Sequence, residues 1–178
     1  MESSFLIPSA ALSALHLTPG QTVADFDAGS GFFTRAAARL CAPGIVWAVD
    51  ANRDLLPRLK NLATGEGLTN VEVVAGNIEK VGGTHLPDKS FDVVVIANSL
   101  FAADDKAAVA AEALRLLKPR GQVLVIDWQD SFGGMGPHPD HVVTAAQASS
   151  LFEQAGFTAE GSAPAGAYHW GLLFRKFA

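Results

Sequence analysis

Residues 23–34 read VADFDAGSGFFT, an apolar run that ends in acidic residues, turns through small residues and enters an amphipathic stretch. This order predicts a strand, a tight turn and a helix. Gly29 and Gly31 let a ligand approach bare backbone, and the N-terminus of the following helix offers free N–H groups. Asp50 closes the next apolar run, IVWAV at 45–49, where an acid can accept hydrogen bonds from a ribose diol. We therefore expect a nucleoside-containing cofactor.

The composition is that of a globular protein with a substantial core. The chain has 178 residues, of which 49% are hydrophobic and 17% are charged, with a net charge of -5. We expect one domain, 1–178, with residues 1–20 as a short N-terminal helix or lid. The acidic balance disfavours nucleic acid as a partner. The single cysteine allows neither an internal disulfide nor a thiolate metal cluster, so we expect a cytoplasmic protein without a metal. No apolar run is long enough for a membrane span.

Apolar strands alternate with amphipathic helices along most of the chain. Helices are predicted after a start near Pro8, after Gly31, after an N-cap at Asp54, over 104–118 and after an N-cap at Thr144. Five strands are predicted near residues 22–26, 45–50, 71–75, 91–97 and 122–126.

Two further strands, at 157–163 and 168–177, leave no room for a crossover helix, so they must run antiparallel to each other. The whole pattern predicts an α/β fold: a doubly wound seven-stranded sheet, mostly parallel with an antiparallel last strand and with helices on both faces. In such a sheet the loops that follow the parallel strands meet at one edge, where a ligand binds.

Three kinds of cofactor are compatible with a glycine turn between a strand and a helix. A P-loop needs a Lys-Ser or Lys-Thr pair at the helix start, and the segment from Gly31 to Thr34 has no lysine. A dinucleotide fingerprint needs a small residue in the sixth position from Gly29, where this chain has the bulkier Thr34. The third candidate is S-adenosylmethionine.

The ordered motifs of the chain resemble those of the class I, Rossmann-like S-adenosylmethionine-dependent methyltransferases. The segment from Asp25 to Gly31 overlays their first motif, an acid followed by alternating glycines. Gly76-Asn77-Ile78 follows the third strand, FDVVV at 91–95 is similar to the fourth motif, and LKPRG at 117–121 is similar to the turn before strand five. The resemblance covers nearly the whole chain and depends on the order and spacing of these motifs together.

The resemblance implies a cofactor site and one departure from the family pattern. Asp27 stands where the family has its first motif glycine, so its carboxylate either clashes with the methionine part of the cofactor or pairs with the ammonium group. Asn77 stands where an acid is common, and an amide oxygen can still accept from the adenine amine. The implied cofactor-binding residues are Asp25, Asp27, Ala28, Gly29, Gly31, Asp50, Ala51, Asn77, Ile78 and Asn98.

The acceptor side is less specific in sequence. Asp127 follows strand five, His138 lies in a Gly/Pro-rich loop at 130–140 and His141 directly follows this loop. These three are the predicted substrate-side, catalytic residues. His169 is predicted to pack or to lie at a sheet edge. Residues 5 and 6 are predicted either to fold over the cofactor as a lid or to cover the sheet.

The resemblance implies in-line methyl transfer from S-adenosylmethionine to a small-molecule acceptor, with S-adenosylhomocysteine as the product. Three alternatives stay open: a protein that binds the cofactor without turnover, a protein methyltransferase, and a dinucleotide-dependent oxidoreductase. The acceptor atom and the oligomeric state do not follow from the sequence.

Overall fold

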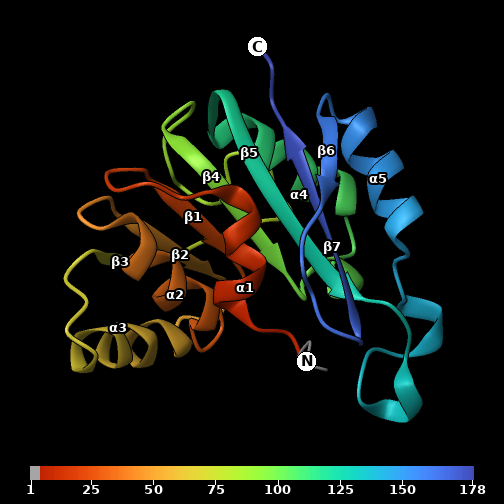
Figure 1. The fold of residues 1–178 in the computed structure, drawn as a ribbon, viewed down its shortest axis with the longest axis horizontal. Coiled ribbons are helices and arrows are strands. Elements are labelled where there is room, and N and C mark those ends of the chain that lie inside the picture. The colour runs from red at the N-terminus through yellow and green to blue at the C-terminus, as the bar shows by residue number, and fades with distance from the viewer. Residues whose placement is uncertain (1–4) are drawn as a thin grey trace.

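The computed structural model describes residues 5–178, and residues 1–4 of the predicted N-terminal segment 1–20 lie outside the described residues. The strands form one seven-stranded sheet in the order β3-β2-β1-β4-β5-β7-β6 (Figure 1). They are β1 (Val23–Phe26), β2 (Val46–Asp50), β3 (Val71–Ala75), β4 (Phe91–Ala97), β5 (Leu117–Trp128), β6 (Thr158–Ser162) and β7 (His169–Arg175). The α-helices are α1 (Pro8–Leu12), α2 (Phe32–Cys41), α3 (Leu55–Gly65), α4 (Lys106–Leu116) and α5 (Ala145–Gln154).

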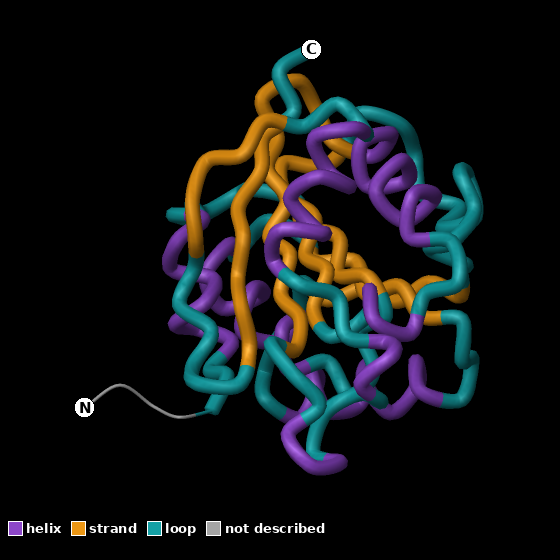
Figure 2. The backbone as a smooth tube through the Cα atoms, turned by 90° about the vertical axis from the view of Figure 1, so that its right-hand side faces the viewer, coloured by secondary structure: helices purple, strands orange, loops and turns teal. Residues whose placement is uncertain are grey.

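The predicted fold class is confirmed. The pairs from β3 through to β5 are parallel, and β7 runs antiparallel to both β5 and β6. The tube view shows helices on both sides of the strands (Figure 2). The carboxyl ends of β1, β4 and β5 therefore meet at one edge, next to the beginning of the reversed strand β7.

Two hydrophobic cores lie on the two faces of the sheet, because successive residues of each strand point to opposite faces. One core contains residues such as Val23, Val93 and Leu124 together with side chains of α1, α2 and α3. The other contains Ala24, Val94 and their neighbours together with side chains of α4 and α5. Burial on both faces explains why the β1 and β4 segments are almost continuously apolar.

Polar side chains cap α4 and α5, whereas Asp54 occupies the predicted N-cap position of α3 without a side-chain cap bond. The Thr144 hydroxyl accepts a hydrogen bond from the backbone N–H of Gln147, whose side chain accepts from the Thr144 N–H, a capping box that confirms the predicted start of α5. The start of α4 falls two residues later than predicted, because Asp105 is the residue whose side chain accepts from the Ala108 N–H.

The start of β5 is also earlier than predicted. Helix α4 ends at Leu116 and the strand begins at Leu117, although a turn was expected up to Gly121. Leu117 pairs with Phe91, and the register then shifts before Gln122 pairs with Val93. The proline at 119 has no backbone N–H and so cannot donate a hydrogen bond to a regular strand ladder. The irregular part of β5 accommodates it.

Candidate cofactor and acceptor site

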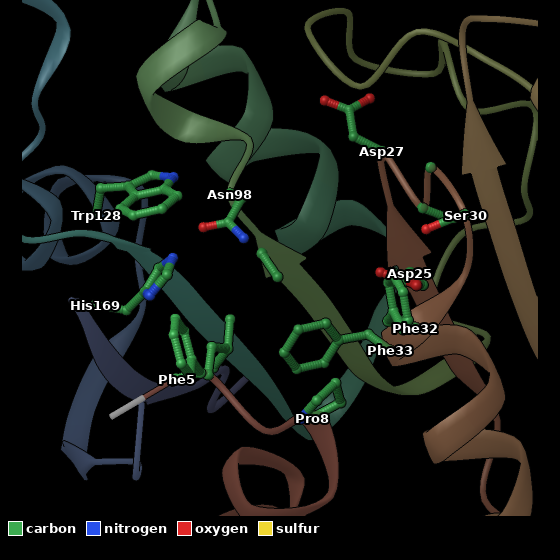
Figure 3. A pocket seen from close by; sticks show the side chains of 14 residues that line it. Phe5, Pro8, Asp25, Asp27, Ser30, Phe32, Phe33, Asn98, Trp128 and His169 are labelled. Atoms are coloured by element: carbon green, nitrogen blue, oxygen red, sulfur yellow. The ribbon is translucent and has the colours of Figure 1, made fainter. Parts of the chain in front are cut away.

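A cavity of about 500 Å³ opens at the edge where β1, β4 and β5 end and β7 begins (Figure 3). This size is within the roughly 300–1,000 Å³ typical of small-molecule sites. Its lining has the glycine turn, acidic side chains, Phe32 and Phe33 on one side, and Phe5, Trp128 and His169 on the other (Figure 3). The lining residues are Phe5, Leu6, Pro8, Asp25, Asp27, Ala28, Gly29, Ser30, Phe32, Phe33, Ala97, Asn98, Trp128 and His169.

The glycine turn has backbone angles that explain its composition. Asp27, Gly29 and Gly31 all have positive φ, of 50°, 57° and 79°. A Cβ at Gly31 would lie 2.6 Å from Cγ of Leu59 in α3, whereas a Cβ at Gly29 would meet only one atom, at 4.0 Å. Gly31 is therefore required by packing as well as by backbone conformation, and Gly29 leaves open space beside the cavity.

Asp50 holds this turn from the neighbouring strand. Its Oδ2 accepts from the Gly29 N–H at 3.0 Å, and its Oδ1 accepts from the Asn52 N–H at 2.9 Å. Each carboxylate oxygen has about two acceptor positions, so both oxygens keep capacity for a further donor. The acid that the sequence places at the end of β2 is therefore bonded to the glycine turn of β1.

Carboxylates crowd the end of the cavity formed by β1. Burial, and more weakly the charges of Asp27 and Asp50, raise the pKa of Asp25 to about 7, although the Thr34 hydroxyl donates to its Oδ2 at 2.6 Å. Loss of hydration is the main cause that raises the pKa of Asp27 to about 6, and the negative charges of Asp50 and Glu79 contribute less. This end of the cavity favours a cation over an anion.

The predicted cofactor residues divide into two groups by position. Asp25, Asp27, Ala28, Gly29 and Asn98 line the cavity. The others belong to the turn, to the end of β2 or to the neighbouring loops: Gly31, Asp50, Ala51, Asn77 and Ile78.

The loops after β2 and β3 lie outside the cavity lining. Asn77 is exposed, and its side-chain oxygen accepts from the Glu79 N–H at 2.8 Å. The Ile78 side chain is buried in the hydrophobic core. Ala51 is exposed at the end of β2.

The predicted acceptor-side residues do not line the cavity. Asp127 is fully buried, and its carboxylate accepts from the Phe101 N–H at 3.0 Å and the Trp128 N–H at 2.8 Å. Burial raises the pKa of Asp127 to about 6 despite these bonds. The side chain therefore anchors the turn at residues 100–102.

His138 and His141 are both exposed, with ring centroids 5.9 Å apart in the loop before α5. His138 also lies 3.4 Å from a carboxylate oxygen of Asp140. Within residues 5–178, no three His, Cys, Asp or Glu side chains gather in an arrangement that could hold a metal ion. The loop is thus a polar surface segment.

Two cavity residues, Trp128 and His169, are absent from the predicted site residues, although Trp128 follows strand five at the edge where a ligand was expected. Trp128 pairs with His169 across β5 and β7, and their ring centroids are 4.2 Å apart. A sequence signal for them existed: an antiparallel last strand begins at the edge where the parallel strands end. The first residue of that strand is therefore placed next to the ligand edge.

The fold and the cavity together define a Rossmann-like α/β protein with a ligand site at the carboxyl edge of its sheet. Residues 24–125 match the methyltransferase domain family, and the chain belongs to that family, as the motifs predicted. A crystal structure of a SAM-dependent methyltransferase from Aquifex aeolicus is 25% identical, with a TM-score of 0.86, and the alignment covers 97% of this chain and 90% of that one. No helix in the described residues combines the length and apolar character needed to cross a bilayer.

Sequence relatives and more distant structures extend the comparison. The ubiquinone/menaquinone biosynthesis C-methyltransferase UbiE of Burkholderia multivorans is 31% identical over 118 residues, which are 66% of this chain and 47% of that protein. The chain thus spans about half the length of the curated relatives it matches. The cyclase SpnF shares the fold, with a TM-score of 0.77 at 18% identity over 95% of this chain and 80% of that one. One fold therefore carries different reactions, and function must be argued from the site.

Proposed function

We propose that this protein is an S-adenosylmethionine-dependent methyltransferase that acts on a small-molecule acceptor. The observation that carries the proposal is the cavity at the carboxyl edge, with a carboxylate-rich glycine turn at one end and aromatic side chains at the other. Family membership and the Aquifex structure support the choice of cofactor.

The charge of the site fits this cofactor. S-adenosylmethionine carries a sulfonium and an ammonium group, and Asp25 and Asp27 line the cavity with raised pKa values. A bound cation lowers those pKa values and offsets the repulsion between the carboxylates. The pyrophosphate of a dinucleotide would add negative charge beside them, which argues against the oxidoreductase alternative.

The residues proposed to hold the cofactor follow the strand ends. Asp25 and the backbone at Asp27, Ala28 and Gly29 hold the methionine part. Asp50 accepts from the ribose hydroxyls with the acceptor capacity that its two backbone bonds leave. Asn77 and Ala51, with the backbone at Ile78, flank the adenine, and Asn98 lies between the cofactor end and the aromatic end (Figure 3).

When bound, S-adenosylmethionine supplies an activated methyl group. The protein then has to align the acceptor and exclude water, since proximity alone accounts for a large share of such a rate enhancement. Phe5, Leu6 and Pro8 line the cavity from the N-terminal segment, and Phe33 and Trp128 line it from the domain body. These side chains provide the apolar wall that keeps water out, and we propose the N-terminal segment as a lid.

The same cavity supports a small molecule rather than a macromolecule as acceptor. The methionine end of the cofactor takes part of the volume of about 500 Å³, so the remaining space and the mostly apolar lining suit a compact organic molecule. The net charge of -5 disfavours nucleic acid. We also propose a cytoplasmic location, which the single, buried cysteine supports.

Calorimetry with S-adenosylmethionine, S-adenosylhomocysteine and NAD tests the cofactor. Saturable binding of the first two, with none of NAD, is expected, and binding of NAD alone would overturn the proposal. A screen with radiolabelled methyl donor and a panel of small acceptors then tests turnover. Tight cofactor binding without transfer to any acceptor, peptides included, would favour the non-catalytic alternative.

A further inference from the structure

His169 is a buried polar side chain without a partner. It is 7% exposed, and neither its Nδ1 nor its Nε2 has a hydrogen-bond partner among residues 5–178. Burial lowers the pKa of this histidine, which favours the neutral ring, with one N–H donor and one acceptor nitrogen. No other buried side-chain nitrogen or oxygen in the described residues lacks a partner.

Two hydrogen bonds fix the backbone around His169 at the aromatic end of the cavity. The Gln129 amide donates to the His169 carbonyl oxygen at 2.8 Å, and the Gln129 N–H donates to the Tyr168 carbonyl oxygen at 2.9 Å. The ring lies between Trp128 and Phe5, on the opposite side of the cavity from Asp25 and Asp27 (Figure 3). The backbone of residue 169 is therefore fixed, and the Trp128 ring packs against the imidazole with ring centroids 4.2 Å apart.

Packing alone does not explain a histidine here. A phenylalanine ring would fill similar space without burying two unpaired nitrogens, each of which loses its hydrogen bonds to water. The next residue shows the usual solution: the buried Trp170 Nε1–H donates to the Val143 carbonyl oxygen at 2.9 Å. The missing partner at His169 therefore points to a ligand group that enters the cavity.

The chemistry of that group follows from its surroundings. Trp128 and Phe5 offer flat apolar faces, and the carboxylates lie at the other end of the cavity, so this end suits an uncharged planar ring. A neutral imidazole has one nitrogen that donates a hydrogen bond and one that accepts. A hydroxyl on a ring can bond to either nitrogen, because it both accepts and donates. We propose that His169 is an acceptor-binding residue, which hydrogen-bonds a hydroxyl on a planar, uncharged ring lying against Trp128. This inference rests on the proposed function, since it takes the opposite end of the cavity as the cofactor end.

Ring-nitrogen NMR of the full chain labelled with 15N-histidine tests the contact. Phenol is the probe, and fluorobenzene is the matched ring without a hydroxyl. Phenol is expected to shift the nitrogen resonances of His169, with and without saturating S-adenosylhomocysteine, and fluorobenzene to leave them in place. A control variant, His85→Asn, removes one exposed histidine signal at a positive φ that asparagine tolerates and should leave phenol binding unchanged.

Variants of His169 measure the size of the effect. His169→Phe is expected to weaken phenol binding by about fivefold to tenfold, the size of one hydrogen bond, without changing fluorobenzene binding. His169→Gln, which can still donate and accept, should retain phenol binding within about threefold. If His169→Phe does not fold, the wild-type shifts and the glutamine variant decide the question.

Two results would overturn the inference: phenol binding that leaves the His169 nitrogens unperturbed, or equal affinity of the wild type for phenol and fluorobenzene. Failure of S-adenosylhomocysteine to bind would instead count against the proposed function. The phenol titration of the cofactor-free protein would still decide the role of His169.

Discussion

The carboxylate of Asp50 accepts a hydrogen bond from the backbone N–H of Gly29 at 3.0 Å, so the end of β2 holds the turn that follows β1. The other oxygen of the same carboxylate accepts from the Asn52 N–H. One side chain therefore shapes the glycine turn and also presents spare acceptor capacity at the edge of the site.

Replacing Asp50 with alanine should damage both roles. We expect Asp50→Ala to weaken S-adenosylhomocysteine binding by at least about tenfold, because hydrogen bonds to a charged group are worth roughly 1.5–3 kcal/mol. The free energy of unfolding should fall by about 1–2 kcal/mol, since two backbone N–H groups lose their acceptor. Calorimetry and urea denaturation measure the two effects.

The control for this prediction is Asp54→Ala. Asp54 is exposed and its side chain makes no cap hydrogen bond at the start of α3. The Asp54→Ala variant should leave the affinity for S-adenosylhomocysteine unchanged. Wild-type affinity in Asp50→Ala would contradict the assigned role.

Asp25 should make stability depend on pH. Its pKa is about 7 in the folded protein and 3.8 as a free side chain, so from about pH 4 to pH 7 the folded state holds a proton that the unfolded chain has released. Stability therefore falls as pH rises through this window. The expected loss from this one group between pH 5 and pH 8 is roughly 2–3 kcal/mol.

Asp25→Asn should remove that slope, because an amide does not titrate and its oxygen can still accept from Thr34. Denaturation curves at pH 5, 6.5 and 8 give the comparison. The remaining slope should come from Asp27 and Asp127, whose pKa values are also raised. An unchanged slope in Asp25→Asn would show that Asp25 is ionised throughout.

Asp27→Gly separates strain from binding. Glycine adopts the left-handed conformation at this position without the cost of about 1 kcal/mol that a side chain brings, and the substitution also removes one of several crowded carboxylates. S-adenosylhomocysteine affinity should therefore stay equal or improve. A loss above about tenfold would mean that the carboxylate itself contacts the cofactor; Asp27→Asn, which tolerates positive φ, then measures the charge alone.

The two turn glycines should differ in their response to alanine. Gly29→Ala meets open space and should cost about 1–2 kcal/mol, from its positive φ alone. Gly31→Ala should cost about 1–3 kcal/mol more, because its Cβ would lie 2.6 Å from Cγ of Leu59. Urea denaturation of both variants tests the order, and equal losses would contradict the packing argument.

His169→Phe should stabilise the protein while weakening its acceptor site. Removing two unpaired buried nitrogens should raise the free energy of unfolding by about 1–2 kcal/mol. Trp170→Phe is the matched control, and it should lower stability because it removes a satisfied bond to the Val143 carbonyl. A destabilised His169→Phe would indicate that the imidazole has a structural partner in the folded chain.

The fold was predictable from the sequence because each element carries its own local signal. Apolar runs bounded by glycine and proline gave the strands, and Thr144 marked the start of α5. The predicted limits of the helix at 104–118 were less accurate. The sequence did not reveal that Asp105 rather than its neighbour caps α4, or that an irregular strand accommodates the proline at 119.

The glycine turn was predictable for the same reason, since its residues are contiguous. The acceptor side of the cavity was not predictable, because its lining depends on which face of the sheet each strand residue points to. Asp127 and Trp128 are neighbours on β5, and successive residues of a strand face opposite sides. Trp128 reaches the cavity while Asp127 is buried against backbone N–H groups. His169 is placed beside Trp128 only by the register of β7 on β5, which no local pattern reveals.

The strand order at the C-terminal side has a consequence for biosynthesis. In the described part of the chain β6 pairs only with β7, although it precedes β7 in sequence. While the polypeptide emerges from the ribosome, residues 158–162 have no strand to pair with until residues 169–175 have been translated and have paired with β5. The wall that carries His169 is therefore among the last parts of the sheet to assemble.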